Sequence, residues 1–143
     1  MRRAAILVLA TAAAAAGCGG DGADPEKTVS LALRGAGEGK AKQVCDQLSD
    51  GAERKLLAVL KDPPLGLPAI KADTCEPAIT ELHAALKPVY RDVLIDHSLA
   101  PAKIDGDRAV VHADGLGMDV ELQKVDGRWI ITGGLLGKEV AGG

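Results

Sequence analysis

The sequence predicts a single α+β domain over residues 25–136, in which helices precede a curved antiparallel meander of four strands. Apolar residues recur at helical spacing as far as about residue 95, and apolar and polar residues alternate after His97. Asp-Gly pairs divide the second part into short segments, as expected of tight turns between strands. Helices segregated from strands in this way are typical of the α+β class.

Capping signals and apolar stripes predict four helices in the first part of the domain. Asp24 is a suitable cap for the first helix, with Pro25 at its first position, and the glycines at 35 and 37 are expected to end it. Three prolines in residues 63–68 predict a loop before the fourth helix. The expected helices cover about residues 25–34, 38–48, 52–61 and 73–86.

Because of Pro88, the sequence allows two positions for the end of the fourth helix. Val89 and Val93 continue the apolar stripe of this helix beyond Leu86 at the same spacing. The helix can therefore stop before Pro88, or continue with a kink to about Ile95.

Three Asp-Gly turns organise the strands. They lie at residues 105–106, 114–115 and 126–127. Between the second and third turns, Met118 and Val120 alternate with Asp119 and Glu121, which predicts one buried face and one solvent face. The two carboxylates therefore belong to the solvent face. The glycine-rich residues 137–143 are expected to be a disordered tail.

The N-terminus has the pattern of a secretory signal. Arg2 and Arg3 precede an uncharged segment, residues 4–16, which is too short to span a bilayer. It ends Ala15-Ala16-Gly17-Cys18, and here the chain resembles a bacterial lipoprotein precursor, although Ala15 stands where that family more often has Leu. The resemblance implies a signal peptide over residues 1–17, lipid attachment at Cys18 and a flexible tether over residues 18–24.

The alternative for this segment is an ordinary secretory peptide cleaved after Ala14-Ala15-Ala16. Both interpretations place the domain outside the cytoplasm. The lipoprotein interpretation adds attachment to the cell membrane on its extracytoplasmic face, because two or more acyl chains give a stable anchor.

Charge and composition argue against nucleic acid as a partner. Removal of Arg2 and Arg3 with the signal leaves 15 basic against 20 acidic residues, a net charge of −5. Such a field does not steer a protein toward nucleic acid or anionic lipid. Tyr90 and Trp129 are the only aromatic residues, too few for a platform that stacks bases.

With Cys18 assigned to lipid, Cys45 and Cys75 remain as an even pair in an oxidising compartment. A disulfide between them would close a loop of 31 residues and stabilise the fold by roughly 3.5 kcal/mol. Two buried free thiols are the alternative. No Cys-x-x-Cys or paired histidine spacing indicates a metal site, and no metal ligand is assigned.

The order of elements and the ending Asp126-Gly127-Arg128-Trp129 resemble the nuclear transport factor 2-like superfamily, a cone-shaped fold shared with ketosteroid isomerases and scytalone dehydratases. More narrowly, the chain resembles small lipoproteins of high-GC Gram-positive bacteria. Those pair a Val-Cys-x-x-Leu-Ser helix, here residues 44–49, with a Cys that heads the long helix, here Cys75. The resemblance covers about residues 25–132 and implies a sheet wrapped around a helix, with a pocket at the open end.

Enzymes of that superfamily use an Asp or His base, often with a Tyr. Tyr90 and His112 are the candidate pocket residues, although a packing role for Tyr90 and a solvated position for His112 are the plainer interpretations. No residue matches a catalytic motif, so no catalytic or cofactor-binding residue is assigned. The other residues considered as partners of Tyr90 are Asp92, Asp96 and His97.

The sequence is compatible with three kinds of function. The leading hypothesis is a non-catalytic, lipid-anchored extracytoplasmic domain that binds a small apolar ligand or an envelope protein. The alternatives are an enzyme of the ketosteroid isomerase or dehydratase kind, and a structural module that forms homodimers through its exposed sheet face. With so few aromatic residues, any pocket is expected to be lined by Val, Leu, Ile, Ala and Met.

Overall fold

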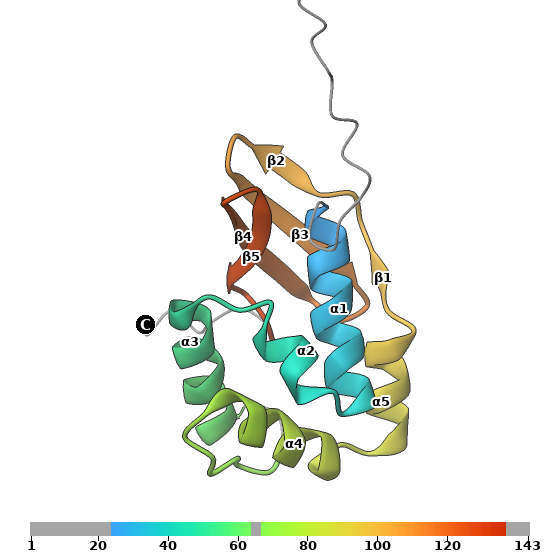
Figure 1. Cartoon of the computed structure of the whole chain (residues 1–143). Helices are drawn as coiled ribbons and strands as arrows, with labels where there is room; N and C mark the ends of the chain where they lie inside the picture. Colours follow the sequence, from blue (N-terminus) through green and yellow to red (C-terminus); the bar gives the residue numbers. More distant parts are fainter. Residues whose placement is uncertain (1–23, 64–66, 137–143) are drawn as a thin grey trace, which may run out of the picture.

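The computed structural model describes residues 24–63 and 67–136, which form five helices and five strands (Figure 1). The expected signal peptide, Cys18, most of the tether and the C-terminal tail lie outside these residues. The helices are α1 (Pro25–Glu38), α2 (Ala41–Cys45), α3 (Asp50–Lys61), α4 (Cys75–Ala85) and α5 (Pro88–Ile95). The strands are β1 (Ser98–Leu99), β2 (Lys103–Asp105), β3 (Arg108–Asp114), β4 (Met118–Val125) and β5 (Arg128–Gly133).

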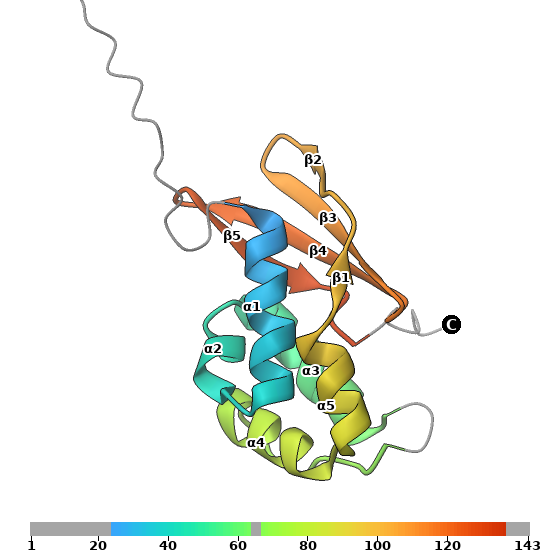
Figure 2. The ribbon, with the colours of Figure 1, turned by 90° about the vertical axis from the view of Figure 1, so that its right-hand side faces the viewer.

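The helices precede an antiparallel sheet, which confirms the α+β class. The sheet has the order β1-β3-β4-β5, and α1 packs across its inner face (Figures 1 and 2). Alternate residues of β3, β4 and β5 point inward, Val111, Val120 and Ile131 among them, and meet Val29 and Leu33 of α1 in one core. The alternation predicted for β4 is therefore confirmed, and Trp129 is buried in the core at 3% exposure.

The sheet has five strands where a meander of four was expected. The additional strand is β1, which pairs with the end of β3 while β2 pairs with its beginning. The register differs by one between the two, since Ser98 faces Asp114 and Lys103 faces Val110. The intervening Pro101 has no N–H for the ladder. A strand of two residues is also too short to show an alternating pattern in the sequence.

Helix α1 continues through the two glycines that were expected to end it, as far as Glu38. Both glycines lie where another segment approaches closely: a Cβ on Gly35 would be 3.0 Å from Val44 Cγ2, and one on Gly37 would be 2.7 Å from the carbonyl oxygen of Arg91. The helix ends instead at Gly39, whose φ of 77° is the left-handed conformation that glycine adopts easily.

The second helix is shorter than the expected range 38–48. Helix α2 ends at Cys45, after which the N–H groups of Gln47 and Leu48 make tighter bonds to the third residue back, and the chain then bonds to β5. Ile131 N–H donates to the carbonyl of Gln47 at 2.8 Å, and Ser49 N–H donates to the carbonyl of Ile131 at 2.9 Å. The Ser49 hydroxyl then caps α3 by accepting from Ala52 N–H at 3.1 Å.

Of the two outcomes open at Pro88, the structure has a stop followed by a new helix. Leu86 and Lys87 are extended, and α5 begins at Pro88. This break rotates the following residues, so Val89 and Val93 are 60% and 44% exposed and do not continue the buried stripe. Leu94 is the residue of α5 that enters the core.

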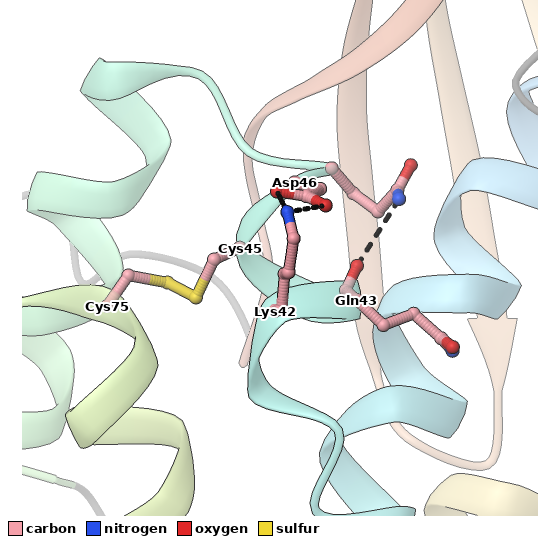
Figure 3. A network of polar contacts seen from close by, with 6 residues as sticks. Lys42, Gln43, Cys45, Asp46 and Cys75 are labelled. Carbon is pink, nitrogen blue, oxygen red and sulfur yellow. Dashed lines mark hydrogen bonds and ion pairs between the residues drawn. A yellow bond between two sulfur atoms is a disulfide. The ribbon is translucent and has the colours of Figure 1, made fainter.

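The disulfide expected between Cys45 and Cys75 is present and joins α2 to the start of α4 (Figure 3). Beside it on α2, Lys42 Nζ donates to both carboxylate oxygens of Asp46, at 3.2 and 2.9 Å. These hydrogen bonds and the negative charge of Asp46 raise the pKa of Lys42 above its usual value.

Candidate functional site: an apolar pocket at the helical end

A cavity of about 350 Å³ lies between the ends of α3, α4 and α5 and the turn from β3 to β4. This volume is at the lower end of the range for small-molecule sites, about 300–1,000 Å³. Over residues 24–63 and 67–136, its lining is apolar apart from the phenol of Tyr90. The lining residues are Val59, Leu60, Pro63, Leu67, Leu82, Leu86, Tyr90, Val93, Leu94, Leu116, Met118 and Leu136.

The pocket has a buried floor and an exposed rim. Leu60, Leu82 and Leu94 are 1%, 3% and 7% exposed and belong to the core. Val93 and Tyr90 are 44% and 53% exposed. A ligand would therefore meet Tyr90 and Val93 next to solvent and the leucines at depth.

Helix α5 supplies both rim and floor because of where it starts. Pro88 sets its first turn, and Tyr90, Val93 and Leu94 then recur at the spacing i, i+3, i+4, on one face of the helix. Leu86 lies in the extended link before α5 and closes the same wall. The break before Pro88 thus turns three residues of α5 toward the pocket.

The segment that follows Leu67 is fixed to α3 beside the pocket. Ile70 is buried, and its N–H donates to the carbonyl of Leu60 at 2.8 Å. Lys61 Nζ donates to the Asp73 carboxylate at 2.7 Å. This hydrogen bond and the positive charge of Lys61 lower the pKa of the Asp73 carboxyl.

The turn between β3 and β4 places Leu116 and Met118 in the lining. Gly115 and Gly117 have φ of 77° and 63°, left-handed conformations in which a side chain is strained. They turn the chain tightly enough to present Leu116 to the pocket and to start β4 with Met118 facing inward.

The two candidate pocket residues lie in different places: Tyr90 is at the pocket rim, and His112 is not among the lining residues. His112 is on the outer face of β3, where its Nδ1 donates to Asp119 Oδ1 of β4 at 2.7 Å. Its Nε2 is 3.7 Å from Asp114 Oδ1. The side chains of all three are about half exposed, so they form a solvated cluster on the far side of the sheet from the core.

The other residues considered as partners for Tyr90 do not line the pocket either. His97 Nδ1 donates to the carbonyl of Leu94 at 2.7 Å, and its Nε2 is hydrogen-bonded to the Ser30 hydroxyl at 3.0 Å. His97 therefore ties the end of α5 to α1. Asp92 and Asp96 are exposed.

The described lining offers one group that can exchange a proton, the Tyr90 hydroxyl, and no carboxylate or imidazole beside it. Within residues 24–63 and 67–136, no group of three His, Cys, Asp or Glu residues could hold a metal ion. Over the same ranges, every helix is too short or too polar to cross a bilayer. An apolar lining of this kind can enclose an apolar molecule and can offer it one hydrogen bond, from Tyr90.

Sequence reasoning missed the loop residues of the lining. Leu67 stands among prolines and Leu116 between two glycines, in segments that were assigned only as loop and turn. A bulky apolar residue flanked by such turn formers is the signal that could have placed them, because its side chain needs a buried contact that the turn itself does not supply.

The fold and the pocket define a small α+β domain with an apolar pocket at its helical end. Comparisons with protein-family models, with curated proteins and with solved structures find no match to this chain. Its function is therefore argued from the pocket and from the sequence.

Proposed function

We propose that this protein is a lipid-anchored extracytoplasmic domain that binds a small apolar ligand in the pocket between α3, α4 and α5. The observation that carries the binding role is the cavity of about 350 Å³, in which Tyr90 is the single polar side chain among the lining residues that the structure describes. Transfer of each methylene group from water into such a cavity contributes about 0.8 kcal/mol. Ten buried methylenes would contribute about 8 kcal/mol, which is of the same order as the entropy lost on association.

The location outside the cytoplasm is supported by the sequence and by the disulfide. Arg2, Arg3 and the uncharged residues 4–16 form a secretory pattern that ends at Cys18. The bond between Cys45 and Cys75 is of the kind that persists in oxidising compartments. Labelling cells with a palmitate analogue tests the anchor: the native chain is expected to take up label, and Cys18→Ala to lose the label and leave the membrane.

We also infer a distant relationship to the nuclear transport factor 2-like superfamily, including its cone-shaped sheet. The support is the element order, with helices followed by an antiparallel sheet over α1, and the placement of the pocket. No residue in the described lining favours the isomerase or dehydratase chemistry of that superfamily, because Tyr90 has no acid or base beside it there.

A pair of valines on α5 tests the binding role. We expect Val93→Asp to weaken binding of the apolar fluorophore 1-aminoanthracene at least about tenfold, because a charge at the rim would have to be desolvated. Val89→Asp is the matched control, since Val89 lies one turn earlier on the same helix, is 60% exposed and does not line the pocket. Failure of the native chain to bind the fluorophore, or equal loss in both variants, would contradict the proposal.

A further inference from the structure

The size of the cavity limits how much of a ligand it can enclose. An apolar cavity of about 150 Å³ binds one benzene molecule, so by proportion a cavity of about 350 Å³ holds roughly fourteen heavy atoms. A single acyl chain of medium length fits.

The floor of the pocket is apolar, and the polar side chain of the described lining lies at its rim. The floor residues Leu60, Leu82 and Met118 are at most 6% exposed and carry no oxygen or nitrogen in their side chains. The one polar group, the Tyr90 hydroxyl, belongs to a side chain that is 53% exposed at the rim. An occupant that buries only apolar atoms at depth and has a hydrogen-bonding group at its outer end matches this gradient, because an unpaired polar group on the floor would be costly.

The charges around Tyr90 on α5 favour one sign of head group on its own side of the helix, because Lys87 and Arg91 precede and follow it at i−3 and i+1, whereas Asp92 at i+2 lies on the opposite face. Lys87 precedes Tyr90 by one helical turn, is exposed, and follows the lining residue Leu86 directly. On the α3 side, the exposed carboxylate of Asp62 precedes the lining residue Pro63. An anionic head would be attracted to the Tyr90 side and repelled by Asp62, which gives it one preferred position.

From these three observations we propose that the pocket binds a single-chain carboxylic acid tail first, with its carboxylate between the Tyr90 hydroxyl and the Lys87 ammonium group. This inference rests on the proposed function and deepens it, because it names the ligand class. The tail occupies the space between Leu60, Leu82 and Leu94. The head stays in water at the rim, where it keeps most of its hydration.

Isothermal titration of the full chain carrying Cys18→Ala, which has no lipid of its own, tests the tail. We expect dodecanoate to bind, hexanoate to bind more than about a thousandfold more weakly or not at all because six fewer methylenes are buried, and hexadecanoate to gain little over tetradecanoate because the cavity is then full. Affinity that rises steadily from hexanoate to hexadecanoate would overturn the size argument.

Ligands with the same tail and different heads test the rim. We expect dodecanoate to bind about three- to tenfold more tightly than dodecyltrimethylammonium, a range set by the modest strength of exposed ion pairs. Lys87→Glu is expected to reverse this order, and Tyr90→Phe to weaken dodecanoate. Lys103→Glu, at the other end of the molecule, is the matched charge control and should leave the order unchanged.

The outcomes of these experiments distinguish a failure of the carboxylic acid assignment from a failure of the proposed function. If 1-aminoanthracene binds and dodecanoate does not displace it, the carboxylic acid assignment is wrong while the apolar binding role stands. If head-group preference is the same in native protein and Lys87→Glu, the rim assignment is wrong. If neither the fluorophore nor dodecanoate binds, both proposals fail together.

Discussion

The disulfide between Cys45 and Cys75 fixes the shortest helix of the molecule. Helix α2 has five residues, and Lys40 before it makes no side-chain capping hydrogen bond. A helix of this length is not stable by itself, because the cost of nucleation exceeds what so few hydrogen bonds return. Its position therefore depends on the disulfide to α4 and on the burial of Val44 against α1.

We predict that Cys45→Ala combined with Cys75→Ala lowers the free energy of unfolding by roughly 3.5 kcal/mol, because the unfolded chain is released from its cross-link. Urea titration followed by far-ultraviolet circular dichroism measures the change. A reductant should destabilise the native protein by a similar amount and have no effect on the double variant. A native protein whose urea midpoint is insensitive to a strong reductant would contradict a stabilising role.

Single residues also show where sequence reasoning succeeds and where it stops. The cysteine pairing could be inferred from parity and compartment, which do not depend on three-dimensional detail. Tyr90 and His112 could not be told apart in the same way. Alternation along β3 assigns His112 to a face of the sheet, but only the packing of α1 decides that this face is the solvated one.

At the scale of elements, the contact between α1 and α5 depends on an absent side chain. A Cβ on Gly37 would be 2.7 Å from the carbonyl oxygen of Arg91 and 2.8 Å from Ile95 Cγ1. The first of these is backbone and cannot rotate away. Gly37 therefore lets α5 lie against α1, and the position of α5 in turn sets the rim of the pocket.

Two glycine-to-alanine substitutions in helices should change the stability of the protein in opposite directions. Gly37→Ala is expected to destabilise the protein by about 1–3 kcal/mol through overpacking, although alanine is the better helix former. Gly51→Ala in α3 is the control: its Cβ would meet only Ser49 Oγ at 3.8 Å, so a gain of about 0.5 kcal/mol is expected. Thermal unfolding of both variants measures the difference, and a Gly37→Ala protein as stable as Gly51→Ala would contradict the close contact.

The same glycines explain an error in the predicted elements. Glycine ends many helices, so Gly35 and Gly37 indicate a stop when only local preference is considered. Here tertiary contacts override that preference, because α2 and α5 need the space. The shortened α2 is likewise followed by backbone, at Gln47 and Ser49, that bonds to β5. Strand β4, whose pattern depends only on its own alternation, was predicted correctly.

At the scale of the whole molecule, the start of α1 and the pocket lie at opposite ends. Glu26 in the first turn of α1 accepts a hydrogen bond from Ala102 N–H, in the link between β1 and β2, at 2.7 Å. Gly37 in the last turn lies against Leu94, which lines the pocket. Both ribbon views place α3, α4 and α5 at the far end of α1 from its first residue (Figures 1 and 2).

This arrangement has a consequence for a protein anchored through Cys18. Pro25 follows Cys18 by seven residues, which span at most about 25 Å. The 14 residues of α1 add about 21 Å between the first turn and the pocket end. With the first turn of α1 held near the bilayer, the pocket would open away from the membrane, so its ligand would arrive from the aqueous side or from a partner.

We predict that a fluorophore at position 103 lies closer to the bilayer than one at position 89 when the lipidated chain is reconstituted in vesicles. Lys103→Cys and Val89→Cys introduce labelling sites at the two ends, and the native pair does not react with maleimide because it is oxidised. Lipids with a spin label on the head group should quench position 103 more strongly. Both positions should lose their quenching in a Cys18→Ala background, which is the control for attachment. Equal quenching at the two positions, or stronger quenching at 89, would show that the pocket faces the membrane surface, and the ligand could then be taken directly from the bilayer.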